Sequence, residues 1–365
     1  MKAIRIAMLL GSAAGLALAS PALAAGQASE TEADAGEIIV TAQRRAESLN
    51  DVSMAVQAVD AETLQALRVT DVRDLTAVAP SFTVSQSYQG VPTYTLRGIG
   101  FNTINLSATS TVGTYVDEVA YAYPIMNTGP VMDLERVEVL KGPQGTLYGR
   151  NTTAGLINFI TAKPTDRFEG GLSVDLGNYE TYNIAGHVSG PLGEGIAARI
   201  AVRSENSDKG WQVSNSRGDR LGKVEKLGVR GSLALDPGEG THIDLSVFWW
   251  QNKSDTVAGQ GIGFTPATDP VTGTSTSSLF NAPGLATYLA ANFPTRASQA
   301  DWAAEPARSA DIGTGLGLKG PLAENNRFWG LKLRLDQELG ADMKLVSLTS
   351  YNDFKRDALS DWSGA

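Results

Sequence analysis

The 365-residue sequence predicts a compact α/β unit followed by the long antiparallel strands of a transmembrane β-barrel. One observation is the leader, residues 1–24, where two basic residues, a short apolar run and an Ala-x-Ala site are typical of a cleavable signal peptide. Another is the change after Pro164 from mixed patterns to strands that alternate apolar and polar residues. The third is the alternation of short turns with long loops along these strands, as in outer-membrane barrels.

Composition excludes several classes of protein. The balance of 30 basic and 39 acidic residues gives a net charge of −9, which makes nucleic acid an unsuitable partner. Cysteine is absent, so disulfides and thiolate metal sites are excluded, and His187 and His242 are isolated. We expect no metal site, no cofactor and no catalytic set. The apolar run of the leader is too short to span a bilayer, although a retained anchor is an alternative, and no other stretch is long enough. Any membrane insertion must therefore use a closed barrel.

Residues 25–47 are predicted to form a disordered tail that contains one strand-like segment. This segment, Glu37–Ala42 (EIIVTA), has four consecutive β-branched residues and no local strand partner. A segment of this kind can add itself to the edge of another protein's sheet. The alternative is that it forms the first strand of the unit that follows.

Residues 48–164 carry mixed helix and strand signals. Strands are expected at 52–59, 93–98 and 112–119, with one helix capped by Asp60 and a second over 71–79. Two segments without periodicity, 100–111 and 120–132, are rich in Asn, Ser, Thr and Tyr, which suits either ligand-binding loops or ordinary solvated loops. The candidate substrate-binding residues are Phe101, Asn102, Asn105, Tyr121 and Tyr123.

The most informative stretch is Asp133–Pro164, which predicts a strand, a glycine-rich turn and a second strand. The limbs are Leu134–Leu140, expected to be only partly buried, and Gly155–Thr161. A phosphate-binding loop is an alternative that the sequence disfavours, because no Gly-Lys-Ser/Thr and no periodic helix follow the glycines. An ordinary hairpin with structural glycines is the simplest interpretation of the spacing alone.

This stretch also resembles the plug-domain signature of TonB-dependent outer-membrane receptors. The resemblance lies in ERVEVLKGP at 135–143, LYG at 147–149 and INFIT at 157–161, with Ala154 and Ala162 as mild departures. Glu37–Ala42 resembles the family's TonB box, and Arg97-Gly98 resembles another plug element.

The resemblance implies roles for three sets of residues. The TonB-binding residues would be Glu37, Ile38, Ile39, Val40, Thr41 and Ala42. The plug structural motif would be Gly98, Gly142, Pro143, Gly145, Tyr148, Gly149, Gly155 and Asn158. A latch between plug and barrel wall would use Arg97, Glu135, Arg136, Glu138 and Lys141, although ion pairs within a partly buried structure are the simpler interpretation of these charges.

Residues 165–365 are expected to form the N-terminal part of the barrel. Seven strands are predicted, with apolar residues facing lipid and polar residues facing inward, and Trp249, Trp250 and Trp329 suit an aromatic girdle. A long extracellular loop would occupy 253–326. A soluble β-sandwich is the alternative. The family has twenty-two strands, so the resemblance implies a fragment. The predicted strands are 168–177, 180–190, 196–206, 223–235, 241–251, 327–337 and 342–354.

The function implied by the resemblance is active transport across the outer membrane. Its partners would be TonB with its inner-membrane energy-transducing complex, outer-membrane lipid and a small ligand, most often a ferric siderophore. Cobalamin, an oligosaccharide or another scarce nutrient is an alternative ligand. A passive porin, an inactive truncated product, a secreted adhesin or hydrolase, and a signal-relaying receptor are alternative functions.

Overall fold

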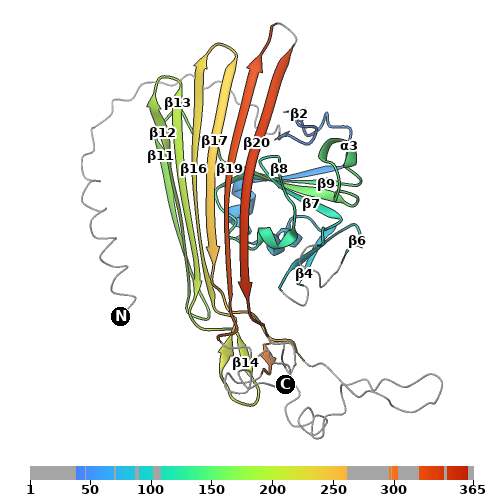
Figure 1. The fold of residues 1–365 in the computed structure, drawn as a ribbon, viewed down its shortest axis with the longest axis vertical. Coiled ribbons are helices and arrows are strands. Elements are labelled where there is room, and N and C mark those ends of the chain that lie inside the picture. Colours follow the sequence, from blue (N-terminus) through green and yellow to red (C-terminus); the bar gives the residue numbers. More distant parts are fainter. Residues whose placement is uncertain are drawn as a thin grey trace, which may run out of the picture. The chain divides into compact units, whose positions relative to one another are not determined.

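The computed structural model describes residues 38–45, 47–69, 71–86, 90–101, 108–260, 296, 298–302, 320–340 and 343–360. The predicted signal peptide, Glu37, Asn102 and Asn105 lie outside the described residues, as does most of the predicted extracellular loop. Residues 39–365 form one compact unit. Within it, an N-terminal globule (residues 39–164) contacts a large antiparallel sheet (Figure 1).

A five-stranded sheet forms the centre of the globule, in the order β3-β9-β10-β7-β8. β9 pairs antiparallel with β10, which confirms the predicted hairpin, whereas β10 and β7 are parallel. All seven residues of β10 are buried. The sequence predicted that Leu134–Leu140 would be only partly buried. This was wrong for Val137–Leu140, which are all buried, including the charged Glu138. The strands are β3 (Val56–Asp60), β9 (Leu134–Lys141), β10 (Gly155–Thr161), β7 (Val112–Val116) and β8 (Val119–Tyr121).

Short helices cover this sheet where the sequence places capping residues. Asp60 accepts a hydrogen bond from the Thr63 N–H and caps α2 (Ala61–Ala66), as predicted. Asp71 caps the 3₁₀ helix η2 (Val72–Ala77) in a capping box with Asp74. Further elements are η3 (Pro124–Asn127), α3 (Gly145–Tyr148), β1 (Ile39–Val40), β2 (Glu47–Ser48), β4 (Phe82–Gln86), β5 (Pro92–Leu96) and β6 (Ile99–Gly100).

Two local predictions for the globule were wrong. The strand expected at 112–119 is broken by a two-residue turn at Asp117-Glu118, so it becomes the hairpin of β7 and β8. The segment 120–132 is not simply irregular, because it contains the end of β8 and all of η3. At 112–119 the alternation of residue types continued through a change in chain direction.

The large sheet has seven antiparallel strands in the order β11-β12-β13-β16-β17-β19-β20, which confirms the predicted number and sequence of strands. The connection at 178–180 is short although it lies at the end of the sheet where the long loops lie. Three short strands, β14 (Gln212–Ser214), β15 (Arg220–Leu221) and β18 (Gln299–Ala300), pair within those loops. The long strands are β11 (Glu169–Gly177), β12 (Thr181–Gly193), β13 (Ile196–Ser207), β16 (Val224–Gly238), β17 (Thr241–Asn252), β19 (Glu324–Glu338) and β20 (Lys344–Ala358).

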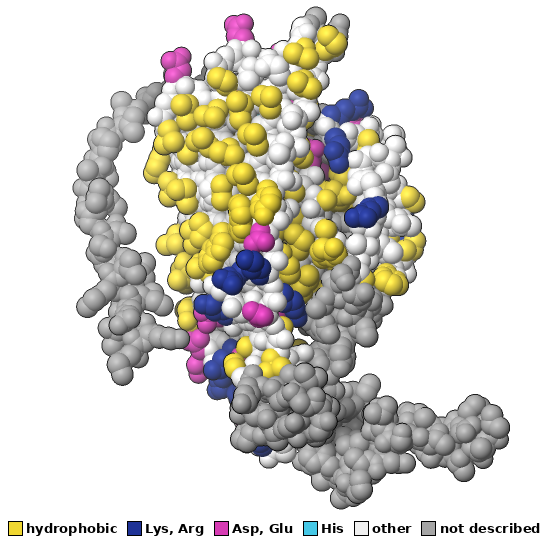
Figure 2. Space-filling view, viewed as in Figure 1, with side chains coloured by type: hydrophobic (Ala, Val, Ile, Leu, Met, Phe, Trp, Pro, Cys, Tyr) yellow, Lys and Arg dark blue, Asp and Glu magenta, His cyan; other side chains and the backbone are white. Residues whose placement is uncertain are grey.

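The two faces of the large sheet differ in polarity. Leu172, Ile200 and Val247 are exposed on one face, where hydrophobic side chains gather in Figure 2. Arg199 and Arg230 are buried on the other face, against the globule. The sequence prediction of apolar-out, polar-in strands is thus confirmed. No helix among the described residues is long and apolar enough to cross a membrane.

Candidate functional site: a charged seam between the globule and the large sheet

Carboxylates of the globule face cations of the large sheet along one line of contact, which we call the charged seam. Its acidic residues lie in turns or caps of the globule, and its basic residues lie on β13, β16 and β19. The seam comprises Asp71, Asp117, Glu118 and Asp133 from the globule with Lys226, Lys332, Arg334, Arg199 and Arg230 from the sheet.

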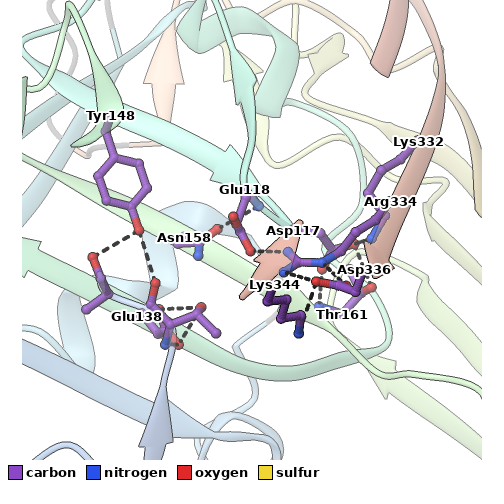
Figure 3. Close-up of polar contacts among 12 residues, drawn as sticks. Asp117, Glu118, Glu138, Tyr148, Asn158, Thr161, Lys332, Arg334, Asp336 and Lys344 are labelled. Atoms are coloured by element: carbon purple, nitrogen blue, oxygen red, sulfur yellow. Dashed lines mark hydrogen bonds and ion pairs between the residues drawn. The ribbon is translucent and has the colours of Figure 1, made fainter. Parts of the chain in front are cut away.

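The turn between β7 and β8 supplies two of these carboxylates. Asp117 lies 3.0 Å from the Lys332 ammonium group, and Glu118 lies 2.5 Å from the Arg334 guanidinium group (Figure 3). Both acidic residues have positive φ, 47° and 69°, a conformation that a two-residue hairpin turn requires and that glycine adopts with less strain. Cations on β19 therefore stabilise a turn in which Glu118 occupies the position where glycine is preferred.

The same turn is also bonded to β10. The N–H and hydroxyl groups of Thr161 both donate to the carboxylate of Asp117, at 2.8 and 2.9 Å. The side-chain oxygen of Asn158 accepts a hydrogen bond from the Glu118 N–H at 3.4 Å. Asn158 is the direct neighbour of Glu138 across β9 and β10. The turn thus joins β19 of the large sheet to the centre of the globule.

Asp133 is the most enclosed acidic residue of the seam. Its side chain is 7% exposed, and it forms a two-pronged contact with Arg199, whose Nε and Nη2 atoms lie 2.9 and 2.6 Å from the two carboxylate oxygens. Arg230 donates to the backbone carbonyls of Met132 and Asp133. Asp133 also has positive φ, at 52°. One aspartate therefore holds two buried arginines of the large sheet.

At the loop end of the seam, Asp71 combines two tasks. It caps η2 and lies 3.5 Å from the Lys226 ammonium group on β16. Burial acts to raise the pKa of Asp71, but Lys226 and Arg73 outweigh burial and hold that pKa well below its ordinary value. Asp71 is therefore ionised at any pH near neutrality.

The N-terminal segment, residues 38–42, is attached to the globule by few bonds. β1 pairs with β2 over two residues only, and the Thr41 N–H donates to the buried Glu138 carboxylate at 2.8 Å. The side chains of Val40 and Ala42 are buried, whereas those of Ile38 and Ile39 are 38% and 44% exposed. The expectation that this segment has no local partner was wrong. A cavity of about 630 Å³ lies beside it, lined also by Arg136, Lys332 and Arg334.

The residues proposed for the latch have their described partners within the globule. Arg136 forms ion pairs with Glu135 and with Glu138, the latter at 2.8 Å. Lys141 donates to the Gln57 side chain at 2.9 Å, and Arg97 is exposed with a φ of 52°. The contacts with the large sheet are instead made by the seam, where the globule supplies the acids. Sequence reasoning missed these acids because Asp117 and Lys332 are 215 positions apart.

The plug-motif residues other than Gly98 lie in β10 or in the connection between β9 and β10. The Tyr148 hydroxyl contacts the backbone carbonyls of Thr41 and Ala42, so it helps to hold the N-terminal segment. Gly155 has a φ of 138°, and a side chain there would collide with the backbone of Leu140. Positive φ is also found at Gly98, Gly142 and Gly149, whereas Gly145 opens α3, directly after the turn that holds Pro143.

The three described candidate substrate residues, Phe101, Tyr121 and Tyr123, differ in their surroundings. Phe101 is 52% exposed and Tyr123 is 38% exposed, whereas the ring of Tyr121 packs 5.2 Å from that of Phe328 on β19. Burial raises the pKa of Tyr121. Tyr121 therefore contacts the sheet wall. A separate cavity of about 170 Å³ lies at the loop end of the seam, lined in part by Asp71, Trp211 and Lys226. The described residues contain no cluster of His, Cys, Asp and Glu that could hold a metal ion.

An aromatic contact lies beside the seam. Trp250 is 1% exposed and packs on Phe328 with ring centroids 5.8 Å apart, so the prediction that it belongs to an outer girdle was wrong. A side chain at Gly129 would collide with the Trp250 ring. Trp249 pairs with the exposed Trp329, and Trp250 is the next residue along β17. Because neighbouring residues of a strand point to opposite faces of the sheet, Trp250 faces the globule.

Close packing predicts that Gly228→Ala will weaken the contact between globule and sheet. A Cβ atom at Gly228 on β16 would lie 2.8 Å from Pro130 and 2.9 Å from Met132, so the expected loss is about 1–3 kcal/mol of unfolding free energy. Gly231→Ala, on the same strand, is the control because nothing lies within 4 Å of its Cβ position. Urea unfolding of the two purified variants tests this, and equal stability would contradict it.

Acid is expected to weaken the seam through Asp117. Burial acts to raise the pKa of Asp117, but Lys332, Arg230 and the Thr161 N–H together lower it below its ordinary value of 3.8. Because the folded pKa is the lower one, the stabilisation is complete above pH 3.8 and is lost as the pH falls through the folded value. The urea concentration at half unfolding should be measured between pH 7 and 2.5. As the pH is lowered, it should fall less steeply for Asp117→Asn than for the parent. Identical pH profiles would contradict the assignment.

Comparison with known proteins agrees with this architecture. Residues 48–156 match the family model described as TonB-dependent Receptor Plug Domain. The pesticin receptor of Yersinia pestis is 31% identical over 224 residues, which cover 58% of this chain and 31% of that protein. This chain thus spans about a third of the length of that relative.

Solved structures share the fold. The ferric yersiniabactin uptake receptor FyuA from Yersinia pestis gives a TM-score of 0.60 at 19% identity, covering 83% of this chain and 41% of that chain. The siderophore receptor PiuA from Acinetobacter baumannii gives 0.61 at 17% identity, covering 85% of this chain and 38% of that chain. The globule therefore matches a TonB-dependent receptor plug domain, and the chain shares the fold of the plug and a run of barrel strands in the two receptors named above.

Proposed function

We propose that this chain forms the gated entrance of an outer-membrane importer, in which the plug domain is displaced by a pull on residues 37–42 from the periplasm. The observation that carries the proposal is the way the N-terminal segment is attached. A two-residue ladder and the contacts of Thr41 with Glu138 and Tyr148 hold a segment whose Ile38 and Ile39 remain exposed. A periplasmic partner that adds a strand to this segment would need to break these few bonds and to expose Val40 and Ala42.

The charged seam fits the same proposal. Its ion pairs lie between the globule and the large sheet, and water that enters when the two separate can solvate both charges. An apolar contact of the same area would instead expose hydrophobic surface when broken. Asp117, Glu118 and Asp133 therefore stabilise the contact between the globule and the sheet, and water can solvate them when the two separate.

For the cargo, we propose an iron chelate of the siderophore class. The support is the set of relatives, which include a siderophore receptor and a ferric yersiniabactin uptake receptor by name. The described residues offer no metal cluster, so iron would arrive inside its chelator as substrate. TonB is the proposed periplasmic partner, and residues 37–42 are its proposed binding segment.

Growth under iron limitation tests the proposal. The gene that carries this sequence is compared with a version lacking codons 37–42, in a strain dependent on it for uptake of a supplied siderophore panel. We expect growth on at least one chelate to be lost on deletion, while the amount of receptor in the outer membrane is unchanged. Uptake that persists after deletion would rule out active import through this segment. Uptake of no chelate by the parent would rule out the siderophore class alone.

A further inference from the structure

The side chain of Asn158 on β10 has a buried donor that is not used. Asn158 is completely buried, and its Oδ1 atom accepts a hydrogen bond from the Glu118 N–H at 3.4 Å. Because the Glu118 N–H is a donor, it fixes the oxygen of the planar amide on the side of the turn and the nitrogen on the other side. That Nδ2 atom has no hydrogen-bond partner among the described residues. A buried N–H group without an acceptor costs free energy, so Asn158 is stabilised if an acceptor comes within reach.

The residue opposite Asn158 is the buried acceptor that holds the N-terminal segment. Asn158 and Glu138 are direct neighbours across β10 and β9, a position in which Cβ atoms are about 5 Å apart. Figure 3 shows Asn158 between Glu138 and Glu118. The Oε1 atom of Glu138 accepts from the Thr41 N–H and from Arg136, whereas the one described donor to its Oε2 atom is the Thr41 hydroxyl, at 3.2 Å. Departure of Thr41 therefore leaves one oxygen of a buried carboxylate without a described donor.

We propose that Asn158 is a positioning residue that transmits release of the N-terminal segment to the charged seam. When Thr41 leaves, the Nδ2 donor of Asn158 turns to the freed Glu138 carboxylate. A hydrogen bond to a charged carboxylate is about twice as strong as one between neutral groups, so this new bond is favoured over the long one to Glu118. Because the amide is planar, the same movement withdraws its oxygen from the Glu118 N–H.

The Glu118 N–H belongs to the turn that contacts the wall. The Glu118 carboxylate pairs with Arg334 on β19, and the residue has a φ of 69°, which few residue types adopt unaided. Loss of its hydrogen bond to Asn158 therefore weakens the support of this seam contact, and by thermodynamic linkage a loosened seam also loosens the segment. The inference rests on the proposed function, in which the segment is pulled from the periplasm. It adds that the pull reaches Arg334 through one side chain.

The test measures hydrogen exchange at the Glu118 amide in the receptor purified from outer membranes, by mass spectrometry with fragmentation to single residues. Thr41→Pro removes the N–H and the hydroxyl that donate to Glu138, and so imitates release of the segment. The Glu118 amide should then exchange about tenfold faster, the factor that one hydrogen bond of ordinary strength contributes. The Asp117 amide in the same turn donates to the Phe159 carbonyl at 2.9 Å, and as the internal control it should keep its rate.

Two further variants separate this coupling from a general loosening of the globule. In a Glu138→Ala background no carboxylate attracts the Asn158 amide, so adding Thr41→Pro should leave the exchange rate of the Glu118 amide unchanged. In an Asn158→Leu background the Glu118 amide has lost its acceptor. It should exchange about tenfold faster than in the parent and gain nothing more from Thr41→Pro. Each background tests the coupling by itself, so the test stands if one of the two variants does not fold.

Three results would overturn the proposal. An unchanged Glu118 rate in Thr41→Pro would mean that water or the Tyr148 hydroxyl takes the place of Thr41. A tenfold rise that persists in the Glu138→Ala background, or an equal rise at Asp117, would mean that the globule opens as a whole. The measurement needs no periplasmic partner and no cargo, so a receptor that imports no chelate can still show the coupling, and one that imports can lack it.

Discussion

Replacing Asp133 with asparagine is expected to lower the unfolding free energy of the purified receptor by about 3 kcal/mol, the largest effect of any conservative substitution in the seam. Asparagine tolerates positive φ, so residue 133 can keep its φ of 52°. The substitution then removes only the carboxylate charge. Arg199 and Arg230, whose side chains are each 6% exposed, then have no buried anion between them. Urea unfolding followed by tryptophan fluorescence measures the loss.

Glu169 provides the matched control for this experiment. It pairs with the same Arg199 guanidinium group at 2.8 Å, but its side chain is 37% exposed. Solvent screens an exposed pair, so Glu169→Gln should change the unfolding free energy by less than about 1 kcal/mol. Equal effects of the two substitutions would show that enclosure at Asp133 does not govern the strength of the contact.

The long strands could be predicted from the sequence because each is a local pattern. Alternation of apolar and polar residues fixes which face of a strand is buried, so the seven strands and the inward direction of Arg199 and Arg230 followed from residue order alone. Trp250 could not be placed in this way. It is a hydrophobic residue on the polar face, and only the globule packed against that face explains it.

The seam could not be predicted because its pairs depend on tertiary register. Signature residues drew attention to Arg136 and Glu138, which pair with each other along one strand. The acids that reach the sheet lie in turns, at Asp117, Glu118 and Asp133. A further signal was present in the sequence: Asp117-Glu118 between two short alternating runs occupies the place where a hairpin favours Asp-Gly. Strained acidic turns of this kind are a reason to look for cations on a facing strand.

Replacing Glu138 with alanine is expected to free the N-terminal segment while leaving the strand pairing of the plug domain in place. Glu138 is completely buried and accepts hydrogen bonds from the Thr41 N–H and from Arg136. Its removal leaves the Thr41 N–H without its described acceptor and leaves Arg136 with the exposed Glu135 alone, at about 3–5 kcal/mol. Since each 1.4 kcal/mol is a factor of ten, the segment should open at least about a hundredfold more often.

The absence of cysteine from the chain makes this opening measurable. Val40→Cys places a single thiol at a position with no solvent exposure, and its alkylation rate reports how often the segment detaches. That rate should rise about a hundredfold when Glu138→Ala is added, and it should rise little with Glu135→Ala, which removes an exposed partner of the same Arg136. Ile39→Cys, already exposed, should react at one rate in all three backgrounds. A Val40→Cys thiol that stays protected without Glu138 would mean that packing of Val40 and Ala42, and not the buried carboxylate, holds the segment until it is pulled.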